Sequence, residues 1–292
     1  MQTWTAELLY ESDLILGEGA HWHSQWKKFL YIDIDGGKVG RIDTVTKITE
    51  EIAINEKVGT VVPANDNKLI VALKSTIEEI DFETGQRRIL ESIESDIQDN
   101  RCNDGKCDAA GRLWIGTTNM PGGLNQAALY CFDGSLQMKL DNVSVSNGIC
   151  WSKDNTIMYY IDSFAYNIKA FDFEISTGTI SNERVLIKIN EPGYIPDGMT
   201  IDDEGMLWVA IWGGACVNRY DPGSGKLIGK IKVAAPNVTA CAFGGDDMKT
   251  MFITTARAGL EEDQLQRFPL SGSLFYITIN IKGAEMNDFS LK

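Results

Sequence analysis

The stretch YIPDGMTIDDEGMLWVAIWGG, residues 194–214, contains the features that decide the fold. An acid-glycine pair, Asp197-Gly198, opens an apolar segment, the polar turn Asp202–Gly205 follows, and MLWVAIW forms a second apolar segment. Two such segments joined by a short polar turn are typical of a β-hairpin. The stretch therefore predicts two antiparallel strands with a carboxylate at the start of the first.

The same hairpin recurs along the whole chain. Its polar turns lie at residues 24–27, 65–67, 108–111, 152–155, 202–205 and 244–247. A third strand follows most copies and ends in an aspartate and a glycine turn, as in CVNRYDPGSG (216–225). A period of about 40 to 50 residues with several short strands per unit is typical of a β-propeller. The sequence therefore predicts an all-β, six-bladed propeller that occupies residues 1–292 as one domain.

One strand stands before the first complete unit, in the segment around Thr3 to Leu9. The last unit ends near the C-terminus, so one blade lacks a strand. We expect the N-terminal segment to pair into the last blade and close the ring.

Composition excludes several classes of function. The chain has 27 Lys and Arg against 41 Asp and Glu, a net charge of -14, which disfavours nucleic acid as a partner. The N-terminus lacks the pattern of a signal peptide, and no apolar run is long enough to cross a bilayer. We therefore expect a cytoplasmic protein without membrane contact, and nothing in the sequence indicates an obligate protein partner.

Residues that often carry chemistry are few or scattered. The six cysteines form no Cys-x-x-Cys pair, so buried free thiols are expected, although Cys102 and Cys107 flank a segment of interest. The only histidines are His21 and His23, which are interpreted as buried and hydrogen-bonded, with an approach of His23 to the channel as the alternative. Four tryptophans are expected in the core rather than in a sugar-stacking platform, namely residues 114, 151, 208 and 212.

Polar residues recur at one position of the repeat, just before the first hairpin strand. Four units carry an oxygen-bearing residue followed by glycine there: Glu18-Gly19, Asp104-Gly105, Asn147-Gly148 and Asp197-Gly198. The innermost strands of a propeller surround a central channel, so these positions are expected to converge on the axis. A single Asp-Gly or Asn-Gly pair is a common turn, but four in register are not explained by turn chemistry. Oxygen donors suit a hard cation, which predicts one divalent metal ion, with Ca²⁺ expected and Zn²⁺, Mn²⁺ or Mg²⁺ as alternatives.

Motifs in the correct order give the chain a resemblance to a known family. LGEGAHW, RCNDGKCDAAGRLWIGTT, SNGICWSKDNTIMYYIDS, PDGMTIDDEGMLWVA and TACAFGGDDMKTMFITTA span nearly the whole sequence. The chain resembles the SMP-30/gluconolactonase family, also called regucalcin-like, of six-bladed propeller lactonases.

The resemblance implies roles for individual residues. It places the metal on Glu18, Asn147 and Asp197, in agreement with the repeat register, and substrate contacts on Arg101 and Asn103. Asp197 would also be the general base. Asp104 would organise the turn or a hydrogen bond to a residue that ligates the metal. Direct ligation of the metal by Asp104 is the alternative. An ion pair with a neighbouring aspartate is the alternative for Arg101.

The implied activity is metal-dependent hydrolysis of sugar lactones such as gluconolactone. Two alternatives remain at this point: a non-catalytic calcium-binding regulatory protein, and a phosphotriesterase-like hydrolase on the same scaffold. The loop TNMPGGLNQ, residues 118–126, lacks the acidic residue of many animal members. We expect this loop to lie over the channel mouth. Because it lacks that acidic group, the protein is expected to act on several five- and six-carbon aldonolactones.

Overall fold

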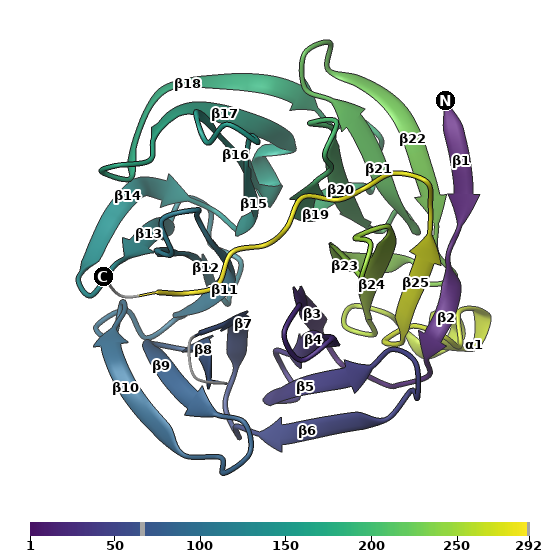
Figure 1. Ribbon diagram of the computed structural model, residues 1–292, viewed down its shortest axis with the longest axis horizontal. Coiled ribbons are helices and arrows are strands. Elements are labelled where there is room, and N and C mark those ends of the chain that lie inside the picture. The colour runs from purple at the N-terminus through teal and green to yellow at the C-terminus, as the bar shows by residue number, and fades with distance from the viewer. Residues whose placement is uncertain (65–67, 291–292) are drawn as a thin grey trace.

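The computed structural model describes residues 1–64 and 68–290, and it forms six small sheets arranged around a central axis (Figure 1). Neighbouring strands within the blades are antiparallel, with the exception of the N-terminal strand added to one blade (Figure 1). The prediction of an all-β, six-bladed propeller is confirmed. The predicted turn at 65–67 lies outside the described residues, whereas turns or bends occupy the other five predicted positions.

The blades are built as follows, from the axis outward. Blade 1 contains β3 (Gly17–His23), β4 (Lys28–Asp33), β5 (Lys38–Asp43) and β6 (Thr49–Ala53). Blade 2 contains β7 (Val58–Pro63), β8 (Lys68–Leu73), β9 (Thr76–Asp81) and β10 (Arg87–Ser92). Blade 3 contains β11 (Asn100–Cys107), β12 (Leu113–Asn119), β13 (Ala127–Phe132) and β14 (Leu136–Val143). Blade 4 contains β15 (Ser146–Trp151), β16 (Ile157–Asp162), β17 (Asn167–Glu174) and β18 (Thr179–Lys188).

The last two blades share the N-terminal segment. Blade 5 contains β19 (Ile195–Ile201), β20 (Leu207–Trp212), β21 (Cys216–Asp221), β22 (Lys226–Lys232) and β1 (Gln2–Thr5). Blade 6 contains β23 (Asn237–Gly244), β24 (Thr250–Ala256), β25 (Leu274–Thr278) and β2 (Glu7–Tyr10). The described helices are a 3₁₀ turn, η1 (Ser163–Ala165), and a short helix, α1 (Glu262–Arg267).

The predicted closure of the ring by the N-terminal segment is confirmed only for the second half of that segment. β2 pairs with β25 in the last blade, as expected, but β1 pairs in parallel with β22 and adds a fifth strand to blade 5 (Figure 1). Trp4 explains this difference, since its ring lies 5.7 Å from that of Trp208. Gly229 in β22 leaves the necessary room, because a Cβ atom there would approach the Trp4 ring to 2.9 Å. The prediction that the whole segment from Thr3 to Leu9 joins the last blade was therefore wrong.

We expect deletions of the N-terminus to separate these two roles. Removing residues 1–5 takes away one edge strand and the Trp4 contact, so the protein should still unfold cooperatively at a temperature lowered by roughly 2–4 °C per kcal/mol lost. Removing residues 1–11 also takes away β2 and its buried Leu9, which opens the ring. Thermal melts followed by circular dichroism should show a much larger loss for the longer deletion; equal losses would contradict the assignment of closure to β2.

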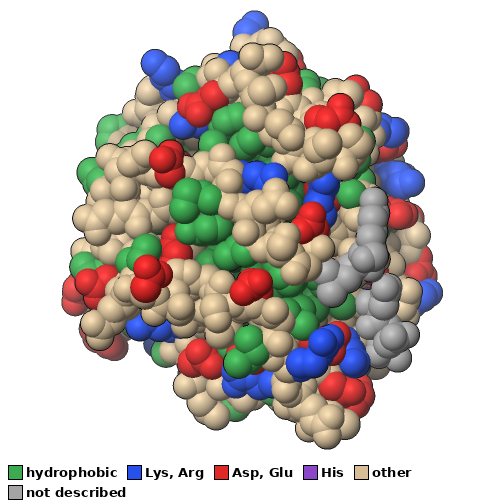
Figure 2. Space-filling model, turned by 90° about the vertical axis from the view of Figure 1, so that its left-hand side faces the viewer, with side chains coloured by type: hydrophobic (Ala, Val, Ile, Leu, Met, Phe, Trp, Pro, Cys, Tyr) green, Lys and Arg blue, Asp and Glu red, His purple; other side chains and the backbone are tan. Residues whose placement is uncertain are grey.

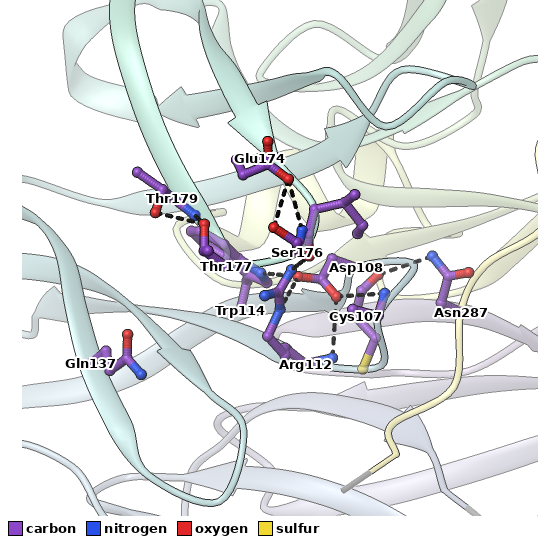
Figure 3. Close-up of polar contacts among 12 residues, drawn as sticks. Cys107, Asp108, Arg112, Trp114, Gln137, Glu174, Ser176, Thr177, Thr179 and Asn287 are labelled. Atoms are coloured by element: carbon purple, nitrogen blue, oxygen red, sulfur yellow. Dashed lines mark hydrogen bonds and ion pairs between the residues drawn. The ribbon is translucent and has the colours of Figure 1, made fainter. Parts of the chain in front are cut away.

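A buried acid-tryptophan contact recurs within two of the blades. The carboxylate of Asp108 accepts hydrogen bonds from Trp114 Nε1 at 2.8 Å and from Arg112 Nε at 2.7 Å (Figure 3). Asp202 accepts from Trp208 Nε1 at 2.9 Å and from Arg219 in the same way. A buried indole N–H and a buried carboxylate each need a partner, and here each satisfies the other. The aspartate of the polar turn is therefore part of the core.

The innermost strands carry the polar residues that the sequence placed at the axis. All six show a shift of register against the second strand of their blade, as at Glu18/His21, Asn147/Ile149 and Pro196/Met199. A β-bulge bends its strand and redirects side chains, and bulges are frequent beside active sites.

Glycine makes these bulges possible at two positions beside the channel. Gly19 has φ +65°, in the left-handed region. Gly148 lies so close to the next blade that a Cβ atom would come within 2.7 Å of the Asp197 carbonyl oxygen. Gly19 thus permits the bend of its strand, and Gly148 permits the close approach of neighbouring blades.

A C-terminal strap, residues 279–290, crosses one end of the channel (Figure 1). It is held by backbone hydrogen bonds to blade 5 through Ala284, to blade 2 through Phe289 and to blade 3 through Ser290. These contacts lie at the ends of the innermost strands, as at Ile201 and Pro63. The opposite end of the channel, where these strands begin, is not crossed by the strap.

The outer surface carries interspersed acidic and basic side chains on the face shown in Figure 2. Among the described residues, no helix is long and apolar enough to span a membrane. All six cysteines are buried and free, as expected, and burial raises the pKa of the Cys102 and Cys107 thiols. These thiols are therefore inert packing groups.

Candidate functional site

A cavity of about 300 Å³ opens at the end of the channel opposite the strap. The starts of four innermost strands, β3, β11, β15 and β19, contribute to it, together with η1 and the end of β20. Its lining residues are Leu16, Glu18, Ile34, Arg101, Asn103, Val145, Asn147, Ser163, Phe164, Ile195, Asp197 and Trp212. All five residues predicted for metal or substrate binding therefore line one cavity, although they come from four different blades.

Two carboxyl groups at the floor of this cavity carry unusual electrostatics. Glu18 and Asp197 are both buried, and each carboxyl group influences the ionisation of the other. Burial, followed by repulsion from Asp197 and Asp104, raises the pKa of Glu18 well above its ordinary value. Burial and the charge of Asp104 raise the pKa of Asp197 in the same direction. The pair holds excess negative charge that either a proton or a cation must neutralise.

A chain of hydrogen bonds connects the remaining polar groups of the cavity. Arg101 Nη1 donates to Asn103 Oδ1 at 2.7 Å, and Asn103 Nδ2 donates to Asn147 Oδ1 at 3.1 Å. Asn147 Nδ2 donates to Ser163 Oγ at 2.8 Å, and Ser163 Oγ donates to the carbonyl of Pro196 at 2.7 Å. The chain fixes the amide orientation of Asn147, so that its Oδ1 lies on the side of Asn103.

Ser163 belongs to this row of hydrogen bonds, and its role was not predicted from the sequence. It is 2% exposed, and it ties the Asn147 side chain to the residue immediately before Asp197. Its position directly after the strand IMYYID gave no chemical signal, because a lone serine in a turn is common. Only the pairing of blades 4 and 5 reveals its role.

Arg101 is half-buried beneath the cavity mouth, and the ion pairs of the described residues do not include it. Its guanidinium is held by Asn103 and by the carbonyl of Cys102 at 2.8 Å. Attraction to Asp35, Glu18 and Asp197 opposes the lowering of its pKa by burial. The alternative of an ion pair with Asp99 or Asp104 is therefore not what the structure shows.

Asp104, the fourth residue in the repeat register, does not line the cavity. It lines a narrow gap farther along the axis, with His21, Lys106 and Met286 of the strap. The bulge of β11 spans both Asn103 and Asp104, so Asn103 takes the position beside Asn147 and Asp104 points deeper. Its influence on the cavity is its negative charge, which raises the pKa of Glu18 and Asp197.

The two histidines are buried, as expected, and the predicted hydrogen bonding is confirmed for His23. His23 Nδ1 accepts a hydrogen bond from the Trp26 amide at 3.4 Å, whereas Nε2 of both histidines has no partner among the described residues. Burial lowers the pKa of His21 to about 3 and that of His23 to about 4, so both are neutral near pH 7. His21, rather than His23, approaches the axis.

Two other expectations about the site need correction. Trp114, Trp151 and Trp208 are buried, but Trp212 is only half-buried and lines the cavity, because it ends β20 at the channel mouth. The loop at 118–126 was expected over the mouth, yet none of its residues is among the described residues that line the cavity. Asn119 instead anchors the loop to Asn100 at 3.0 Å.

Comparison with known proteins places the chain among relatives of the same length. Regucalcin of Oryctolagus cuniculus is 38% identical over 275 residues, which cover 91% of this chain and 92% of that protein. The solved structure of a calcium-binding protein, regucalcin, from Agrobacterium tumefaciens has a TM-score of 0.95 at 26% identity and full coverage of both chains. That of a luciferin-regenerating enzyme has a TM-score of 0.90 at 28% identity and covers 98% of this chain and 100% of that one.

The family model described as SMP-30/Gluconolactonase/LRE-like region matches residues 16–257. This range includes every polar residue that lines the cavity. The chain therefore belongs to the SMP-30/gluconolactonase/LRE-like family.

Proposed function

We propose that this protein is a metal-dependent lactonase, a hydrolase that opens lactones such as the aldonolactones. The observation that carries the proposal is the convergence of Glu18, Asn147 and Asp197 in one cavity with Arg101 and Asn103 beside them. The gluconolactonase in the family description supports lactone hydrolysis as the reaction.

The donor set fits a single hard divalent cation. Two buried carboxylates with raised pKa values supply uncompensated negative charge, and Asn147 Oδ1 keeps one lone pair beside its hydrogen bond from Asn103. The described residues contain no group of three or more His, Cys, Asp or Glu arranged for a metal, and in this proposal the Asn147 amide is the third protein ligand beside the two carboxylates. Glu18, Asn147 and Asp197 would hold the ion.

The residues of the cavity divide the chemical work. A bound divalent ion supplies Lewis acidity toward the lactone carbonyl. Asp197, a carboxylate that lines the cavity, accepts a proton from the attacking water. Arg101 carries the positive charge that binds the carboxylate product as the ring opens, and Asn103 fixes the Arg101 guanidinium at 2.7 Å.

A non-catalytic calcium-binding protein is the second candidate. The similarity to the calcium-binding protein of Agrobacterium tumefaciens favours it. The two candidates share the metal site and differ in whether Asp197 and Arg101 act on a substrate.

Hydrolysis of aldonolactones distinguishes the candidates. We expect calcium-loaded protein to release acid from several five- and six-carbon aldonolactones in a pH-stat assay, and Arg101→Ala to lower kcat/KM for all of them by on the order of 10- to 100-fold. Arg88→Ala is the matched control, because Arg88 lies on an outer strand in an exposed ion pair with Glu79. Metal binding without hydrolysis of any lactone would instead select the calcium-binding candidate.

Ser163 offers a test of how the metal ligand is positioned. We expect Ser163→Ala to weaken metal binding by about 10- to 100-fold, because Asn147 loses the partner that fixes its amide. Ser163→Thr keeps the hydroxyl and should retain most of the affinity. Isothermal titration calorimetry with Ca²⁺ measures both variants, and equal affinities for Ser163→Ala and the unaltered protein would show that Asn147 needs no such support.

A further inference from the structure

The cavity has a polar floor and apolar walls. Half of its lining residues are hydrophobic, namely Leu16, Ile34, Val145, Phe164, Ile195 and Trp212. They come from blades 1, 4 and 5 and from the segments that lead into them, so the apolar surface surrounds the floor on several sides. A polyhydroxylated ring placed here would turn its hydroxyl groups toward carbon atoms.

The polar floor has few donors left for a substrate. Both hydrogens of Asn103 Nδ2 are engaged, by the carbonyl of Ser146 at 2.8 Å and by Asn147 Oδ1 at 3.1 Å. The hydroxyl hydrogen of Ser163 is engaged by Pro196. Among the described residues Arg101 donates only through Nη1 and keeps several N–H groups unused, whereas Asn147 Nδ2 keeps a single hydrogen beyond its bond to Ser163. One guanidinium can bind a carboxylate or a carbonyl, but it does not provide separate hydrogen-bond partners for a set of sugar hydroxyl groups.

Two aromatic side chains at the mouth are exposed more than packing requires. Phe164 is 38% exposed although it follows Ser163, which is 2% exposed, and Trp212 is half-buried. Trp212 lies directly across from Ile195 in the register of β19 and β20, so the two form one continuous wall. Exposed aromatic groups that rim a cavity are typical of binding surfaces for apolar groups.

We propose that the preferred substrates of this site are lactones with an apolar substituent on the ring, rather than polyhydroxylated sugar lactones. The lactone carbonyl lies on the floor between Glu18, Asp197 and Arg101, and an alkyl substituent packs against Trp212, Phe164 and Ile195. This inference rests on the proposed lactonase function and refines its substrate class. Aldonolactones are accepted, but their hydroxyl groups lose water without gaining partners.

The apolar walls predict a dependence of rate on chain length. Each methylene that leaves water for the wall contributes a factor of about three to four in kcat/KM. The series from δ-valerolactone to δ-decanolactone adds up to five methylene or methyl carbons to the same reacting ring. We expect kcat/KM to rise along this series and to exceed that of D-glucono-δ-lactone.

A pH-stat comparison of this series on calcium-loaded protein tests the inference. Trp212→Ala should flatten the dependence on chain length, and Trp212→Phe should restore most of it. Phe164→Ala serves as a second variant whose folding is not at risk, because Phe164 is exposed. Ile89→Ala is the matched control, since Ile89 is 63% exposed on β10 and should leave every rate unchanged.

The outcomes separate the inference from the function on which it rests. A flat series with faster hydrolysis of D-glucono-δ-lactone would overturn the inference and leave the lactonase function standing. A kcat/KM that rises with chain length equally in Trp212→Ala, Phe164→Ala and the unaltered protein would also overturn the inference. The apolar walls would then not be the surface that binds the alkyl substituent. Hydrolysis of no lactone with Ca²⁺, Mg²⁺, Mn²⁺ or Zn²⁺ would overturn both.

Discussion

Asp197→Asn is expected to reduce kcat for lactone hydrolysis by roughly 10² to 10⁴ even when metal is saturating. The substitution keeps an oxygen donor but removes the negative charge and the group that accepts the proton from water. Metal affinity should weaken as well, so rates must be measured at several metal concentrations and extrapolated to saturation. Activity that returns fully at high metal would show that Asp197 is a ligand only.

Asp104→Asn is the matched control for this experiment. Asp104 is also an acidic residue in a bulge of an innermost strand, but it lines the gap farther along the axis rather than the cavity. Its removal takes away a charge that raises the pKa of Asp197, so we expect a shift of the pH-rate profile toward lower pH and only a small loss at the optimum. A loss as large as that of Asp197→Asn would place Asp104 in the reaction.

Glu18→Gln is expected to change stability and metal binding in opposite directions. Loss of a residue that hydrogen-bonds to a metal ligand typically lowers metal affinity by about 10- to 100-fold. Glu18→Gln should lower it further, because the substitution removes a charged ligand itself. The melting temperature of the metal-free protein should rise, because a buried carboxyl with an unfavourable charge is replaced by a neutral amide of similar shape. Differential scanning fluorimetry with and without Ca²⁺ measures both effects, and destabilisation of the metal-free protein would contradict the electrostatic description.

The pH dependence of stability follows from the same two carboxyls. Their pKa values are raised in the folded state, so the folded, metal-free protein binds more protons than the unfolded chain above the ordinary carboxyl range. Their contribution to stability should therefore be fully present at low pH and be lost as pH rises through the window between the ordinary and the raised pKa values. Added Ca²⁺ should remove most of this loss, and Glu18→Gln should reduce it.

The blade pattern was predictable from sequence because it depends on local chemistry. Period-two strands, polar turns and the repeat distance recur in each unit, so one correct hairpin at 194–214 implied the others. The convergence of Glu18, Asn147 and Asp197 followed from the same repeat, since equivalent positions of different blades meet at the axis.

The features that sequence reasoning missed depend on contacts between blades. Parallel pairing of β1 with β22 is decided by the packing of Trp4 on Trp208, which are more than two hundred residues apart in the chain. The bulge in β11 spans two residues, so the repeat register could not tell whether Asn103 or Asp104 reaches the cavity.

The walls of the cavity were equally hidden from the sequence. Trp212 has the alternation of a core residue, but the strand ends at the channel mouth and leaves its ring half-buried. Ile34 and Val145 belong to different blades and carry no motif. Apolar residues that line a site have the same pattern as apolar residues that fill a core, so only the folded arrangement separates them.

Titration of metal-stripped protein with Ca²⁺, with metal binding and lactone hydrolysis followed in the same samples, shows whether the bound ion is required for the reaction. We expect one bound ion per chain, hydrolysis that is absent without metal and rises in proportion to the occupied fraction, and loss of both signals in Glu18→Gln at the same metal concentrations. Hydrolysis by the stripped protein at the full rate, or stoichiometric binding of the ion without hydrolysis of any lactone, would contradict this expectation.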